Sequence, residues 1–102
     1  MLVDAVKRKL RITYEDADVN ARVDDIMAQA DADLRRTLGI DDEAFTFETP
    51  GTEQFLYLAF CFYEWNDAGD DFGANYAEKI AQCRDKWLVK KFAENEEGTA
   101  DV

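Results

Sequence analysis

The stretch DADVNARVDDIMAQADADLRRTLG (16–39) decides the fold, because it carries the clearest helical pattern in the chain. Its apolar residues recur at the spacing of one helix face, and they are Val19, Val23, Ile26, Met27, Ala30, Leu34 and Leu38. Acidic residues open the stretch and arginines close it, as the helix dipole favours. Gly39 can then end the helix in a left-handed conformation. The pattern predicts a helix over 16–38 with one face in a core and the other in solvent.

A second strong signal follows after Pro50 and Gly51, where Thr52 can cap a helix over 53–66. Its centre, FLYLAFCFYEW (55–65), is apolar on all sides and must be covered on all sides. Three short neighbouring helices leave an aromatic surplus, which either fills a small aromatic core or forms a partner surface. The residues of this surplus are Phe55, Tyr57, Phe62 and Trp65.

Two more helices are predicted at the ends of the chain. Residues 3–11 place apolar side chains at i, i+3 and i+7, which predicts a short first helix. After a turn at 66–73, Asp70 or Asp71 can cap a last helix that runs to about Phe92. One row of this helix holds Tyr76, Ile80, Cys83 and Trp87, and the adjacent row holds Ala77, Ala81, Leu88 and Phe92.

The remaining segment, IDDEAFTFETPG (40–51), reads as a loop with a short alternating piece. It either packs Phe45 and Phe47 onto the helices as an irregular loop or adds a strand to another subunit. We therefore expect an all-α fold, a small bundle of about four helices with this loop or extended segment between the second and third. Residues 1–92 form a single domain, and residues 93–102 form an acidic, frayed tail.

Composition narrows the class of protein. The chain has 102 residues, a formal net charge of −11 and no His. The charge argues against a nucleic-acid binder, since affinity for phosphate backbones comes from Lys and Arg. The absence of His removes the commonest general base and metal ligand. We expect no enzyme.

Motifs for chemistry are missing. No stretch satisfies the spacing of an EF-hand, a phosphate-binding glycine loop or a Cys-x-x-Cys pair, so we predict no catalytic residue, metal site or cofactor. Cys61 and Cys83 fall in apolar rows and are expected to be buried, inert thiols. The opening MLVDAVKRKL is the reverse of a secretory leader, and the apolar run at 55–63 is too short for a membrane helix, so we expect an intracellular protein with no membrane partner.

The charge is unevenly spread along the chain. Residues 1–11 carry four basic residues against Asp4, for a net +3, and residues 12–78 carry three against seventeen acids, for −14. Residues 79–91 carry five basic residues against Asp85, for +4, and residues 94–102 carry −4. Two basic end helices thus bracket an acidic middle. Solvated faces explain this distribution, and so would complementary edges that meet in a head-to-tail assembly.

The order of these elements resembles the small head–tail connector proteins of long-tailed bacteriophages, also called adaptor or head-completion proteins. The motifs that carry the resemblance are KRKLRIT (7–13), DAD (16–18), VDDIMAQADADLRRTLGI (23–40), FLYLAFCFYEWND (55–67) and FGANYAEKI (72–80). The resemblance implies an all-α structural protein that forms a ring, typically twelve-fold, beneath the portal at the head–tail junction of the virion, after assembly in the host cytoplasm. Such a ring extends the DNA channel and docks the tail or a stopper protein. Packaged DNA passes through it without sequence-specific binding.

The resemblance also implies roles by position. Portal docking falls on the last helix, at Trp87, Leu88, Lys90, Lys91 and Phe92. Subunit contacts pair the basic first helix with acids of the long helix, at Lys7, Lys9, Arg11, Asp24, Asp25 and Asp31, and Phe45 and Phe47 join them if the loop pairs with a neighbour. Trp87 and Phe92 could equally be the core end of the last helix.

An alternative function also fits a small, acidic, helical chain. A DNA-mimic inhibitor would occupy a nucleic-acid-binding protein by spacing acids along one surface like phosphates. The two basic end helices separate the alternatives, because a mimic has no need for them.

Overall fold

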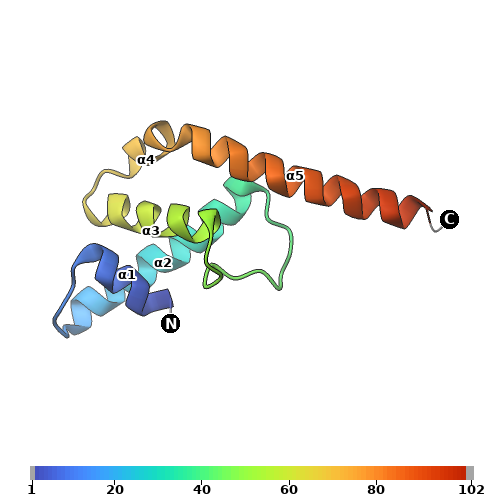
Figure 1. The fold of residues 1–102 in the computed structure, drawn as a ribbon. Helices are drawn as coiled ribbons and strands as arrows, with labels where there is room; N and C mark the ends of the chain where they lie inside the picture. The colour runs from blue at the N-terminus through green and yellow to red at the C-terminus, as the bar shows by residue number, and fades with distance from the viewer. Residues whose placement is uncertain (1, 101–102) are drawn as a thin grey trace.

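The computed structural model describes residues 2–100, with side chains described for residues 2–93. Over this range the fold is all-α, with five helices and no strand (Figure 1). The helices are α1 (Leu2–Leu10), α2 (Ala17–Leu38), α3 (Thr52–Trp65), α4 (Gly69–Asn75) and α5 (Ala77–Ala100). The all-α prediction is confirmed, and the expected number of about four helices is close but one short.

Helix α2 has the ends that its sequence predicts. A carboxylate oxygen of Asp16 accepts hydrogen bonds from the backbone N–H groups of Asp18 and Val19, at 2.9 and 3.0 Å. At the other end Gly39 adopts a left-handed conformation with φ 70°, where a side chain would be strained. The predicted apolar row faces inward, and Val23, Ala30 and Leu34 are fully buried.

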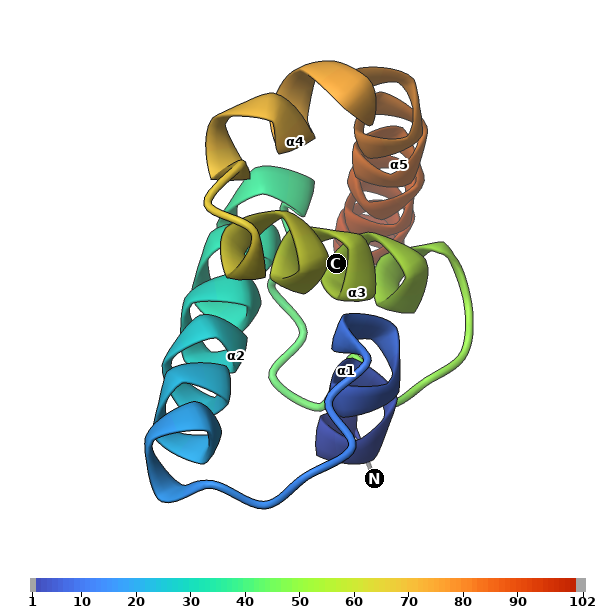
Figure 2. The ribbon, with the colours of Figure 1, turned by 90° about the vertical axis from the view of Figure 1, so that its left-hand side faces the viewer.

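Helix α3 is the centre of the fold. It packs against each of the other four helices, and Figure 2 shows it crossing between α1 below and α4 above. Leu56, Tyr57 and Cys61 are buried in it, and the Tyr57 hydroxyl donates to the Met27 carbonyl of α2 at 3.0 Å. The helix begins at Thr52, so the prediction that Thr52 caps it was wrong. Gly51 is the N-cap residue, with φ 151° and no side chain to cap the helix.

The last helix predicted from the sequence is two helices. Tyr76 breaks the run with φ −116° and ψ 18°, and α4 and α5 lie on either side of it. The break lets α4 fold over α3, where the Phe72 ring meets Phe60 at 5.4 Å and Tyr76 at 5.3 Å. Helix α5 continues to Ala100, beyond the end near Phe92 that the pattern predicts. The frayed tail is expected over residues 93–102, and the side chains after residue 93 lie outside the described residues.

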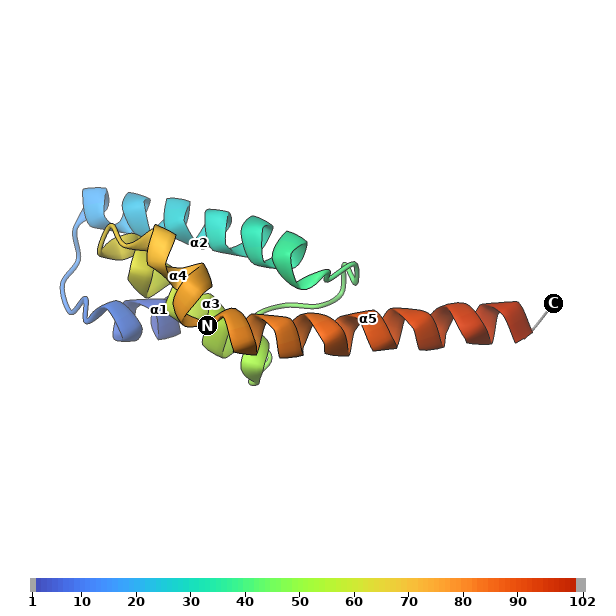
Figure 3. The same ribbon diagram turned by 90° about the horizontal axis from the view of Figure 1, so that it is seen from above.

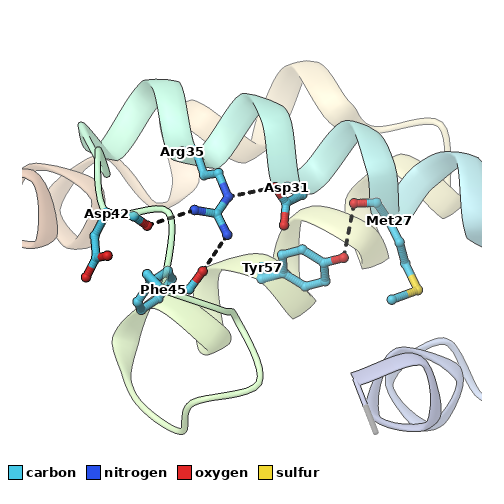
Figure 4. A network of polar contacts seen from close by, with 6 residues as sticks. All are labelled: Met27, Asp31, Arg35, Asp42, Phe45 and Tyr57. Carbon is cyan, nitrogen blue, oxygen red and sulfur yellow. Dashed lines mark hydrogen bonds and ion pairs between the residues drawn. The ribbon is translucent and has the colours of Figure 1, made fainter.

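The 40–51 segment is an irregular loop that packs onto the helices. The Phe47 side chain is 1% exposed, and the Phe45 ring stands edge-on to the rings of Phe47 and Trp87, each at 5.2 Å. Arg35 holds the loop from α2, as Figure 4 shows: it donates to the Phe45 carbonyl at 2.6 Å and the Asp42 carbonyl at 3.4 Å, and pairs with Asp31 at 2.7 Å. Of the two readings left open by the sequence, the loop that packs on its own helices is the one seen.

The molecule is long and thin, with extents of 56 × 27 × 18 Å. Figure 3 shows why: α5 runs on past the body formed by α1 to α4 and carries the C-terminal end far from it. Helix α5 also carries exposed apolar side chains.

Candidate functional site

The middle of α5 presents an apolar surface. Leu88, Val89 and Phe92 are 52, 67 and 61% exposed. Leu88 and Phe92 stand four residues apart on the side of the helix that faces away from the core, with Val89 beside them. Large apolar side chains gathered on one exposed helix face are a feature of protein interaction sites.

Contacts of Trp87 fix the orientation of this part of α5. Its ring is 9% exposed and packs on Phe45, and its indole N–H donates to the Glu53 carboxylate at 3.3 Å. Lys86 forms an ion pair with the same carboxylate, and the Lys90 ammonium lies 4.9 Å from the centre of the Trp87 ring. These contacts clamp α5 to the first turn of α3, so the apolar surface next to Trp87 is held in a fixed orientation.

The clamp changes the pKa of Glu53. Burial alone raises the pKa of this carboxylate, but the hydrogen bond from Lys86, the backbone N–H of Glu53 itself, the Lys86 charge and the Trp87 indole outweigh burial. The pKa therefore lies below its ordinary value of 4.5. Glu53 stays ionised while it is buried in the clamp.

We expect this carboxylate to make the clamp sensitive to acid. Because its pKa is lowered on folding, the stability that it contributes is present above the ordinary value of 4.5 and is lost as the pH falls through the lowered value. Glu53→Gln should lower the free energy of unfolding by about 1–3 kcal/mol near pH 7. That difference from the unchanged protein should shrink as the pH is lowered to about 3, as measured by urea titrations.

Glu43→Gln is the matched control, since it removes an exposed loop carboxylate that contacts neither Lys86 nor Trp87. A Glu53→Gln deficit that stays constant over the whole pH range would contradict the role given to the carboxylate.

A second surface is a groove of about 680 Å³ between the C-terminal ends of α1 and α3. It is lined by Arg8, Lys9, Leu10, Arg11, Phe62, Trp65 and Asn66. The Lys9 ammonium lies 5.6 Å from the centre of the Phe62 ring, which is 42% exposed. Arg22 of α2 stacks on Trp65 at 4.4 Å and donates to its carbonyl at 2.8 Å. The groove thus has an aromatic floor and a basic rim.

Some of the predicted subunit-contact residues are exposed, and others are engaged within the chain. Lys9 and Arg11 lie at the groove, and Asp24 and Asp25 are exposed on α2. Lys7 is half-buried and lies 3.8 Å from Glu15. The others are engaged within the chain: Asp31 pairs with Arg35, Phe45 packs on Trp87, and Phe47 lies in the core. Phe47 is therefore a core residue, because the loop needs it to cover Tyr57, 4.8 Å away.

The predicted docking residues are divided in the same way. Leu88 and Phe92 are exposed, but Trp87 belongs to the clamp and Lys91 forms an ion pair with Asp41 at 2.9 Å. Sequence reasoning missed Val89, which stands beside Leu88. It also missed Arg8 and Arg22, although the basic first helix was already a signal for Arg8.

Cys61 and Cys83 are buried and free, as the sequence predicts. Burial raises the pKa of Cys61 to about 12, with a smaller effect of the Glu64 charge, and raises the pKa of Cys83 to about 11. At about pH 8 we expect iodoacetamide to modify either thiol at least about 100-fold more slowly in the folded protein than after unfolding in guanidinium. Mass spectrometry of timed samples measures this. Modification of either Cys at the rate of the unfolded chain would contradict its burial.

No family model matches the chain, and no match is found among curated proteins or solved structures. Within the part of the chain that the structure describes, no helix is both long and apolar enough to cross a membrane. The same residues bring together no three His, Cys, Asp or Glu side chains that could hold a metal ion. The two surfaces are therefore the features from which a function can be inferred.

Proposed function

We propose that the protein is a structural virion protein, a subunit of a ring-forming head–tail connector that sits below the portal of a long-tailed bacteriophage. The observation that carries the proposal is the apolar surface of α5, where Leu88, Val89 and Phe92 stand exposed on a helix clamped to the body. A rigid helix with an apolar face is a common means of docking into a groove of a partner. In this proposal the partner is the portal protein.

The negative net charge of the chain suits a subunit that lines a DNA channel. At a net charge of −11, the surface repels phosphate, so DNA can pass through the ring without being gripped. The proposed ring contains about a dozen subunits, extends the DNA channel below the portal, and offers its lower face to the tail or a stopper protein. It belongs at the head–tail junction of the virion and assembles in the host cytoplasm.

The shape of the subunit also supports a ring rather than a DNA mimic. A ring is built from one heterologous contact repeated around an axis, so each subunit needs two different surfaces for its neighbours and a third for the portal. The groove, the exposed face of α2 and the apolar surface of α5 are candidates for these three contacts. A mimic needs acids along one surface and has no use for a basic groove or a projecting apolar helix.

Binding to the portal tests the proposal directly. The portal protein encoded by the same genome is immobilised as assembled rings, and the purified chain is passed over it in a surface-binding assay. We expect saturable binding with about one chain per portal subunit. No binding at any concentration that keeps the chain in solution would contradict the docking role.

A further inference from the structure

The cations at the groove have no ion-pair partner among the side chains that the structure describes. Arg8, Lys9 and Arg11 are exposed, and among the described side chains no ion pair joins any of them to a carboxylate. This is unexpected in a chain with 23 acidic residues against 12 basic ones. An uncompensated basic rim in so acidic a protein indicates that the charges act on something outside the subunit.

The backbone conformation of Arg11 also indicates that its side chain acts on something outside the subunit. Arg11 directly follows α1 and has φ 60°, in the left-handed region that favours glycine. Its N–H donates to the Arg8 carbonyl at 3.1 Å, and the N–H of Ile12 donates to the Lys7 carbonyl at 2.9 Å. These bonds close the C-terminal end of the helix, where glycine would adopt the left-handed conformation without strain. An arginine at this position sacrifices some local stability and places a cation at the mouth of the groove.

The floor of the groove is apolar enough to bury a contact. Phe62 is partly exposed, Trp65 is half-buried and Leu10 lies beneath the rim. Aromatic and Arg residues are enriched at the centres of protein interfaces, and a cation over an aromatic ring is a favourable contact. The groove can therefore take a segment that offers small side chains for its floor and carboxylates for its rim.

The exposed face of α2 is such a segment. Asp24 and Asp25 are exposed, and no described cation pairs with either of them. Ala21, Ala28 and Ala32 are exposed beside them, so this face is smooth as well as acidic. It lies opposite the buried row of α2 and is turned away from α1 and α3, which Figure 2 shows on the inner side of α2. One subunit cannot bring its own α2 face into its own groove.

We propose that the groove between α1 and α3 receives the exposed face of α2 from a second copy of the chain, with Asp24 and Asp25 of one subunit against Arg8, Lys9 and Arg11 of the next. The contact is heterologous, because the groove and the α2 face are different surfaces, and it repeats from subunit to subunit. The inference rests on the proposed function for its setting, since it names the contact that would close the ring. It leaves the apolar surface of α5 free for the portal.

A charge exchange tests the contact. The first variant carries Arg8→Glu and Arg11→Glu, the second carries Asp24→Lys and Asp25→Lys, and the third carries all four substitutions. We expect each double variant to weaken self-association at least about tenfold, because like charges then face each other. The fourfold variant should recover association to within about threefold of the unchanged protein, since opposite charges face each other again. Sedimentation velocity at about 50 mM salt measures association, and circular dichroism checks folding.

The second variant separates this contact from an effect of net charge. Asp24→Lys with Asp25→Lys makes the chain less acidic, so net charge alone would strengthen association, whereas the proposed contact requires it to weaken. Lys79→Glu with Arg84→Glu is the matched control for the first variant, because it makes the same charge change on α5, outside the groove. This control should weaken association less than Arg8→Glu with Arg11→Glu does.

The remaining outcomes decide against the inference or against the proposed function. Association that is unchanged in both double variants overturns the inference, even if the portal still binds. Recovery in the fourfold variant without portal binding keeps the inference and removes the connector role. A labelled single-stranded oligonucleotide of about 30 nucleotides is the probe for a different occupant. Binding of that probe that is lost in the Arg8→Glu and Arg11→Glu variant would overturn the second copy in favour of nucleic acid.

Discussion

Phe47→Ala is expected to lower the free energy of unfolding by about 3–5 kcal/mol, the range for removing a large buried aromatic side chain. Phe47 is 1% exposed and its ring lies 4.8 Å from Tyr57 and 5.2 Å from Phe45. Its removal leaves a cavity between the loop and α3. It also takes away the ring on which Phe45 rests, and Phe45 in turn covers Trp87. In a domain of this size the loss is a large share of the total stability.

Urea unfolding followed by tryptophan fluorescence measures the effect. Thr46→Ala is the matched control, because Thr46 is the exposed neighbour of Phe47 in the same loop, and its change should stay within about 0.5 kcal/mol. A Phe47→Ala protein as stable as the control would mean that the loop does not belong to the core. The strand-pairing reading of residues 40–51 would then return.

Leu88→Glu combined with Phe92→Glu is expected to weaken portal binding at least about 100-fold, since two central apolar anchors are replaced by charges that would have to be buried. The fold should be unaffected, because both side chains are more than half exposed and contribute little to the core. The free energy of unfolding should change by less than about 0.5 kcal/mol. The portal-binding assay and a urea titration on the same sample measure the two quantities.

The control is a pair of charges added elsewhere. Thr13→Glu with Tyr14→Glu adds the same two charges in the exposed segment between α1 and α2, on residues outside α5. It should bind the portal as the unchanged protein does, apart from a small effect of net charge. Equal loss in both double variants would show that repulsion rather than docking explains the result. Unchanged binding in Leu88→Glu with Phe92→Glu would remove the apolar surface of α5 from the interface.

The parts of the fold that were predictable are those set by local physics. In α2 the apolar period, the Asp16 cap and Gly39 all specify one helix, and all three are seen. In α3 the long apolar run is predicted to be a helix from its length, from a Thr52 cap and from the scarcity of strands elsewhere, and of these supports the Thr52 cap was wrong. The break at Tyr76 was not predictable, because no proline marks it and one apolar row continues through it. The break depends on how Phe72 packs against Phe60 of a different helix, which is a tertiary contact.

The same division holds for the candidate surfaces. Charge along the sequence indicated that the first helix would offer cations. Only the fold shows that Lys7 is half-buried near Glu15, while Arg8 is exposed and forms no ion pair with a described carboxylate. The apolar row of the last helix contained both core and surface residues. The loop decides which is which, because Phe45 covers Trp87 and leaves Leu88 in solvent. Neither outcome follows from the spacing of residues within one helix.

The mass of the protein in solution tests the connector account most directly. Light scattering at about 50 mM and about 500 mM salt, alone and with the portal rings, gives the number of chains in each particle, and electron micrographs give its shape. We predict closed rings of about a dozen subunits, with a mass about twelve times the 11.7 kDa of one chain. A particle of 11.7 kDa under every condition, with no ring in the images and no assembly on the portal, would contradict the account.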